Sequence, residues 1–215
     1  MWRFRMILVV LLLVLSCKET KRYHDKQPAN ELISNAGSLS DVYEFQAKLN
    51  AEFKNPETSP LPDRYRKNFA SLDFFAPDST YQVMARITRT PEALPFLMPT
   101  TTGDRTEEVV YAKISFKLNG KEHELEVYQN TELRQQANFK DYLFLPFSDL
   151  TNGEETYEGG RYLDLAIPKG DTILLDFNMA YNPYCAYNAK YSCPVVPKQN
   201  RLDTPIRAGV KAFDK

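Results

Sequence analysis

The residues best suited to chemistry lie between Asp149 and Lys211. Two cysteines, Cys185 and Cys193, stand there with seven residues between them. In an exported protein such a pair is first interpreted as a disulfide bond. Two free thiols, a redox pair or a metal-binding pair remain open as alternatives.

Familiar catalytic and metal-binding patterns find little support. The chain has two histidines, His24 and His123, so a four-ligand zinc site lacks obvious partners for the cysteines. It has no C-x-x-C redox motif and no G-x-S-x-G nucleophile motif. His123 stands beside apolar strand residues, which favours a packing role. We therefore predict no metal and no cofactor.

Polar and aromatic side chains in the same stretch could bind a ligand. Arg161 follows Gly159-Gly160 and could pair with Asp149, with Asp164 or with an anionic ligand. The candidate ligand-binding residues are Tyr157, Arg161, Asn178, Tyr181, Asn182 and Asn200. The alternative is structural, because asparagine amides often hold irregular backbone together.

The N-terminus carries a targeting signal. The apolar run Met6 to Leu15 follows two arginines and is too short to span about 30 Å of hydrocarbon, but it suits a signal peptide. It leads into Val14-Leu15-Ser16-Cys17, which resembles a bacterial lipobox. Lipidation of Cys17 would anchor the chain to a membrane without a spanning helix.

Three regions follow from this pattern. We predict a lipoprotein signal peptide over 1–16, a flexible polar tether over 17–38 and a single β-rich domain over 39–215. Lys18, where an aspartate would favour retention at the inner membrane, favours the outer membrane of the cell envelope, facing the periplasm or the surface. A net charge of −1 with mixed signs excludes a nucleic-acid partner.

The elements that position the candidate residues are mostly strands. An amphipathic helix is predicted from Asp41 to Lys54, with Ser40 as its N-cap. Its apolar stripe is Val42, Phe45, Leu49 and Phe53. Alternation from Tyr81 to Ile87 predicts a strand, and Asn119-Gly120 predicts the turn of a hairpin.

Further strands are predicted over 141–147, 162–167 and 172–177. The run Ile173-Leu174-Leu175 does not alternate, which is typical of a central strand buried on both faces. The sequence therefore predicts an α+β, mainly β fold, an antiparallel sandwich or small barrel with an N-terminal amphipathic helix.

Long motifs of the C-terminal third resemble a known family. They are T-N-G-E-E-T-Y-E-G-G-R-Y-L-D-L, D-F-N-M-A-Y-N-P-Y-C-A-Y-N and S-C-P-V-V-P-K-Q-N-R-L. The chain from Val42 to Lys211 resembles the bacterial and archaeal family catalogued as domain of unknown function 1684. The resemblance implies no established activity. It also implies paired cysteines in members that look cytoplasmic, where thiols stay reduced. Val210 departs from the glutamate that the family more often has there.

Together these features favour a membrane-anchored lipoprotein that acts as a binding or accessory module of the cell envelope. Its partner would be a small molecule or an envelope protein, and Cys17 would hold it to the membrane. The alternative is an envelope enzyme, hydrolytic or thiol-dependent, that uses Cys185 or a carboxylate such as that of Asp176.

Overall fold

The computed structural model describes residues 38–214. The predicted signal peptide, Cys17 and the tether up to residue 37 lie outside the described residues. The helices and strands are α2 (Leu39–Lys54), α3 (Asp63–Arg66), β1 (Gln82–Arg89), β2 (Phe96–Pro99), β3 (Arg105–Leu118), β4 (Lys121–Asn130), β5 (Tyr142–Phe147), β6 (Arg161–Ala166) and β7 (Thr172–Asp176). Six short 3-10 turns include η5 (Phe177–Met179), η6 (Tyr184–Ala186) and η7 (Lys198–Asn200) among the described residues.

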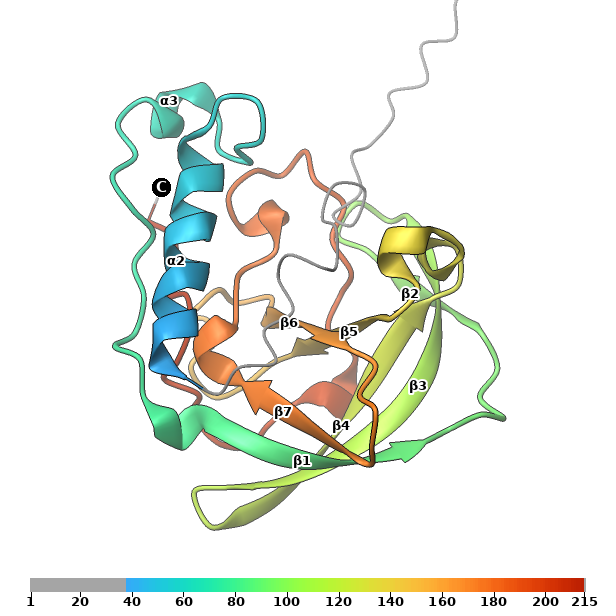
Figure 1. Cartoon of the computed structure of the whole chain (residues 1–215). Helices are drawn as coiled ribbons and strands as arrows, with labels where there is room; N and C mark the ends of the chain where they lie inside the picture. Colours follow the sequence, from blue (N-terminus) through green and yellow to red (C-terminus); the bar gives the residue numbers. More distant parts are fainter. Residues whose placement is uncertain (1–37, 215) are drawn as a thin grey trace, which may run out of the picture.

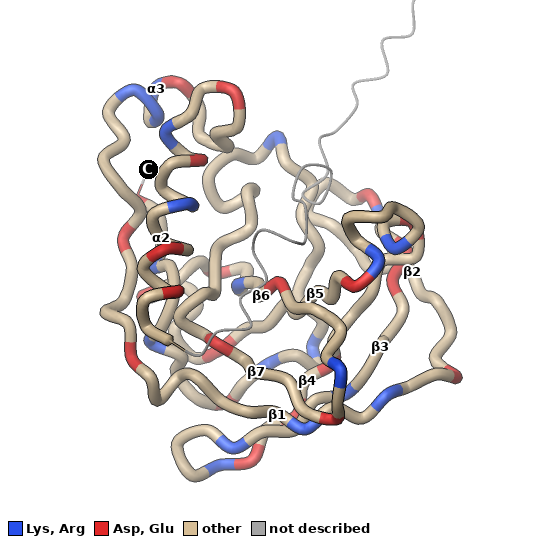
Figure 2. Tube along the Cα trace, viewed as in Figure 1, with Lys and Arg blue, Asp and Glu red and all other residues tan. Residues whose placement is uncertain are grey.

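The described strands form one antiparallel sheet that curls into a half-barrel (Figure 1). Their order is β6-β5-β4-β3-β1-β7, and β2 adds to β3 outside this path. The fold is therefore mainly β, with a single curled sheet where the sequence left a sandwich or a barrel open. Lys and Arg are scattered among Asp and Glu over the whole trace (Figure 2).

The predicted hairpin is confirmed. β3 and β4 pair up to Leu118 and Lys121, and Asn119 and Gly120 form the turn between them. Both turn residues have positive φ angles, 51° and 79°. This is the backbone that an Asn-Gly pair adopts at low cost, and its twist matches that of the flanking strands.

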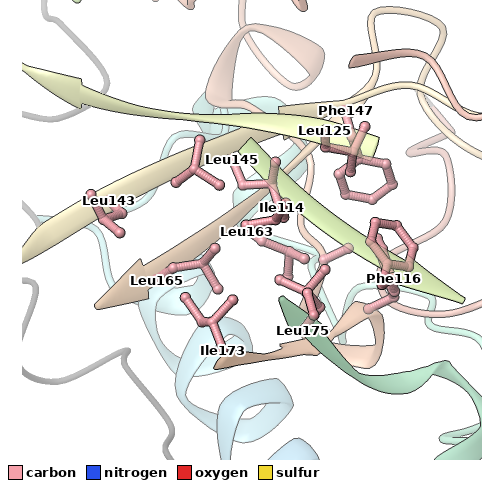
Figure 3. Close-up of a cluster of buried hydrophobic side chains, with 14 of the residues drawn as sticks. Ile114, Phe116, Leu125, Leu143, Leu145, Phe147, Leu163, Leu165, Ile173 and Leu175 are labelled. Atoms are coloured by element: carbon pink, nitrogen blue, oxygen red, sulfur yellow. The ribbon is translucent and has the colours of Figure 1, made fainter. Parts of the chain in front are cut away.

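One face of the sheet encloses an aliphatic core. Alternate residues of β5 and β6 point inward, among them Leu143, Leu145, Leu163 and Leu165. Figure 3 shows them facing Ile173 and Leu175 of β7 across the half-barrel. The two ends of the strand order, β6 and β7, thus meet over a shared core although they do not pair.

The opposite face of β4, β5 and β6 is aromatic. In the described chain this second core buries seven tyrosines: Tyr128, Tyr142, Tyr162, Tyr181, Tyr184, Tyr187 and Tyr191. It is covered by α2 and by the segment that follows β7 (Figure 1). The candidate residues after position 176 therefore belong to a layer packed on the outside of the half-barrel.

The N-terminal helix packs on this layer through the predicted stripe. Val42, Phe45, Leu49 and Phe53 are its buried side chains. It begins at Leu39, two residues before the predicted start, because Ser38 and not Ser40 is the N-cap. The backbone N–H of Ser38 donates to Oδ2 of Asp41 at 3.4 Å, which is one half of a capping box. No helix within residues 38–214 is both long and apolar enough to cross a membrane.

The prediction that β7 is a central strand is wrong. β7 stands at one end of the strand order, and β1 is its only partner among the described strands. Ile173 and Leu175 face the core, whereas Leu174 is partly exposed beside β6. The run of three apolar residues thus reflects the approach of β6 and α2 and not burial in the middle of the sheet.

Candidate functional site

Arg161 lies inside the protein and binds the chain itself. Its guanidinium donates to Oδ2 of Asp149 at 2.8 Å, and neither side chain has any exposed surface. Further donation goes to the carbonyls of Ile206, at 2.8 Å, and Ala208. Burial lowers the pKa of Arg161, and Asp149 opposes that shift. The sequence left Asp149, Asp164 and an anionic ligand open as partners of Arg161. In the structure the partner is Asp149.

The glycines before Arg161 permit two close approaches. A Cβ on Gly159 would come within 2.5 Å of the Tyr157 ring, which folds back over this backbone. A Cβ on Gly160 would come within 2.6 Å of the Phe147 carbonyl oxygen, and its φ is +88°. The Gly-Gly-Arg motif therefore places Tyr157 and lets β6 start against β5.

Three asparagines brace the segment after β7. The Asn178 side chain binds both backbone groups of Asp78, at 2.9 Å each. Asn182 donates to the carbonyl of Lys211 at 2.8 Å. Asn200 bonds both backbone groups of Glu126 and donates to the carbonyl of Pro146 at 2.7 Å.

These three amide side chains are all buried. They hold irregular backbone together, which was the alternative to ligand binding in the sequence analysis. Asp176 is also occupied. Its Oδ1 accepts from the backbone and side chain of Asn178, and its Oδ2 accepts from Gln82 at 2.8 Å.

Tyr181 lines a cleft where β6 and β7 meet. The cleft opens to solvent and is small, with a cavity volume of about 20 Å³, close to the space that one water molecule occupies. Its lining residues are Phe45, Leu163, Asp164, Leu165, Leu174, Asp176, Met179 and Tyr181. Its walls are therefore mostly apolar, with two carboxylates and one phenol among them.

Asp164 is the carboxylate of this cleft that two tyrosine hydroxyls contact. Its Oδ1 accepts hydrogen bonds from the hydroxyls of Tyr142, at 2.7 Å, and Tyr181, at 2.6 Å. Burial raises the pKa of Asp164 to about 6, and the two tyrosine donors oppose that rise. The carboxyl group of Asp164 therefore changes its charge near pH 6. It was not among the predicted ligand residues.

The cysteine pair forms a second polar feature. Cys185 is partly exposed and Cys193 is buried, and no bond joins their sulfurs in the structure. The disulfide placed first from the sequence stays a prediction. The backbone N–H of Cys185 lies 3.1 Å from Sγ of Cys193. Within residues 38–214 no group of three His, Cys, Asp or Glu side chains could hold a metal ion.

Tyr157 reaches this pair. Its hydroxyl lies 3.9 Å from Sγ of Cys185. A hydrogen bond from Cys193 lowers the pKa of Cys185 to about 7, against the effect of burial, and donors on Tyr157 and Thr101 add to the lowering. The same contact raises the pKa of Cys193. The proton is thus held on Cys193 and the negative charge is favoured on Cys185.

Two further carboxylates outside the predicted set are removed from solvent, Glu52 in part and Glu108 fully. Glu52 of α2 accepts a hydrogen bond from the Tyr184 hydroxyl, and burial raises its pKa. Glu108 has no exposed surface and accepts from Asn130 at 2.7 Å. The only sequence signal for Glu108 was its place two residues before the alternating apolar residues that run from Val110 to Leu118. The helix pattern gave no signal for Glu52.

Comparison with known proteins agrees with this fold. Residues 67–211 match the family described as "Protein of unknown function (DUF1684)". The solution NMR structure of an uncharacterized protein from gene locus rrnAC0354 of Haloarcula marismortui is 33% identical, with a TM-score of 0.63. The match covers 80% of this chain and 93% of that one. No curated protein matches the chain. The chain therefore belongs to the DUF1684 family of proteins of unknown function.

Proposed function

We propose that this chain is a lipid-anchored binding module of the cell envelope, and that its ligand site is the cleft between β6 and β7. Cys17 would hold it to the outer membrane, and the tether would separate the folded part from the lipid surface. The observation that supports the site most directly is the partly buried carboxylate of Asp164, which lies in an otherwise mostly apolar cleft.

The chemistry of the cleft selects a class of ligand. A carboxylate attracts an ammonium or another hydrogen-bond donor with positive charge, and such bonds contribute about 1.5–3 kcal/mol. The cleft has room for little more than the charged group itself, and the apolar side chains of Phe45, Leu174 and Met179 that line it would contact the hydrocarbon next to that group. We therefore propose an organic cation as the ligand, either a small amine or an ammonium group that an envelope protein presents.

The predicted ligand residues take different parts in this proposal. Tyr181 stays a ligand residue because its ring lines the cleft and its hydroxyl orients Asp164. Arg161, Asn178, Asn182 and Asn200 hold the surrounding backbone. Asp176 lines the same cleft, but its oxygens are bound by Asn178 and Gln82. This leaves Asp164 as the charge that a ligand would meet.

The site is tested by NMR titration of the isotope-labelled full chain with n-butylammonium, which combines a cation with an apolar body. We expect amide shifts to gather around Asp164, Met179 and Tyr181. Asp164→Asn should weaken binding at least about tenfold, the equivalent of 1.4 kcal/mol. Asp171→Asn, an exposed aspartate outside the cleft, is the matched control. Equal affinity of the two variants would reject the site.

The anchor is tested separately by labelling cells with radioactive palmitate. Wild-type protein should carry the label and Cys17→Ala should not. Label on Cys17→Ala would exclude lipidation at Cys17. Fractionation of the same cells shows whether the labelled protein enters the outer membrane, and its recovery in the inner membrane would contradict the proposed location.

A further inference from the structure

The cysteine pair lies outside the proposed ligand cleft and has its own chemistry. Cys185 belongs to η6, and Cys193 lies beyond a seven-residue loop beside Thr101. Neither sulfur lines the cleft between β6 and β7. The backbone N–H of Cys185 donates to Sγ of Cys193 at 3.1 Å, so the two residues are already in direct contact. A claim about this pair therefore stands apart from the proposed ligand site.

The two thiols differ in access and in charge. Cys185 is partly exposed, whereas Cys193 has no exposed surface. The Tyr157 hydroxyl lies 3.9 Å from Sγ of Cys185, and this hydroxyl and the Cys193 thiol both favour the Cys185 thiolate. A thiolate is the attacking form in thiol–disulfide exchange, and access decides which sulfur meets another molecule first.

The surrounding loop is held without a bond between the sulfurs. Cys193 exchanges two hydrogen bonds with Thr101, one through its N–H at 3.1 Å and one through its carbonyl at 2.9 Å. On the other side, the Tyr184 hydroxyl binds Glu52 of α2 and Asn188 donates to the Pro60 carbonyl at 3.2 Å. The reduced pair can thus persist in a folded protein, as a cycling dithiol requires.

We propose that Cys185 and Cys193 form a redox-active dithiol that reduces a disulfide of another molecule, with Cys185 as the attacking thiol and Cys193 as the resolving thiol. The Cys185 thiolate attacks one sulfur of the disulfide, and the other leaves as a thiolate that takes up a proton. Cys193 then gives up its proton and attacks Sγ of Cys185. The second thiol leaves, so the substrate gains two electrons and the pair becomes a disulfide.

Full-length protein in detergent tests this order of attack. Every protein carries Cys17→Ser, so that Cys185 and Cys193 are its only cysteines. Reduced samples are mixed with oxidised glutathione or with a disulfide-bonded protein and then quenched with acid. The mass of the intact protein is measured by mass spectrometry. Wild type should lose both thiols and keep no adduct. Cys193→Ser should retain one mixed disulfide, and Cys185→Ser should react at least about tenfold more slowly than Cys193→Ser.

Several results separate this proposal from a structural disulfide. Reaction with either oxidant supports it, and the faster one shows whether the substrate is a small or a protein disulfide. Equal rates for the two serine variants would overturn it, as would no reaction of wild type. The wild type alone gives an independent measure. Its oxidised fraction should follow the ratio of glutathione forms, and a pair that stays oxidised throughout, or unfolds when reduced, contradicts a cycling dithiol.

Discussion

Arg161 and Asp149 form an ion pair at 2.8 Å that is wholly removed from solvent. The pair joins the start of β6 to the loop after β5 and, through the carbonyls of Ile206 and Ala208, to the C-terminal segment. A buried charge is costly once its partner is gone, because water cannot replace the lost contact. The most prominent charge of the C-terminal motifs is therefore part of the framework.

Loss of this arginine should destabilise the fold. Arg161→Ala leaves Asp149 buried without its partner, so we expect the free energy of unfolding to fall by about 3–5 kcal/mol. Urea denaturation measures the change. Arg207→Ala is the matched control, because Arg207 pairs with Glu155 at 2.9 Å on the exposed surface and should change stability by about 1 kcal/mol or less. Similar losses in both variants would contradict the framework role.

Glu108 should make stability depend on pH. Burial raises its pKa in the folded protein from 4.5 to about 7. The folded state then holds a proton that the unfolded chain releases, so the free energy of unfolding falls as pH rises from about 4.5 to about 7. Glu108→Gln keeps an acceptor for Asn130 and removes this cost.

At pH 8 this variant should be about 3 kcal/mol more stable than wild type, and at pH 4 the two should be similar. Denaturation across that pH range, with the exposed neighbour in Glu107→Gln as control, checks the difference. A variant that is less stable than wild type at pH 8 would show that the carboxylate is needed in its charged form.

Tyr157 should tune the reactivity of Cys185. Tyr157→Phe removes a hydroxyl that lies 3.9 Å from the sulfur, so the pKa of Cys185 should rise. Alkylation by iodoacetamide at pH 7 should slow by about two- to tenfold, with the midpoint of its pH profile moved upward. Tyr43→Phe, on the exposed face of α2, should leave the profile unchanged. An unmoved midpoint in Tyr157→Phe would remove the tyrosine from this role.

Local sequence patterns predicted the helix and the hairpin. The candidate site instead depends on contacts between residues that are far apart in the sequence. Asn119-Gly120 indicated the hairpin because the two residues alone favour its turn. The four apolar residues of α2 likewise repeat at helical spacing. By contrast, Asp164 meets Tyr142 only through the register of β5 on β6, and meets Tyr181 through a bridge from Tyr162. Neither pairing has a local signal.

The sequence also could not separate bracing from binding. The sequence offered Asp149 as one possible partner of Arg161. It could not show that the carbonyls of Ile206 and Ala208 also surround the guanidinium and leave it no ligand-binding role. The amide of Asn200 reaches Glu126 and Pro146, which are 74 and 54 residues away in the chain. Polar residues of these types serve both purposes, and only their burial and their partners distinguish them.

The affinity of the wild-type chain for n-butylammonium at pH 8 and at pH 5 tests the proposed ligand site most directly. Asp164 has a pKa of about 6, so it is charged at the higher pH and largely protonated at the lower one. We predict binding at least about fivefold tighter at pH 8, with the pH dependence lost in Asp164→Asn. Equal affinity at the two pH values would contradict the assignment of Asp164 as the binding charge.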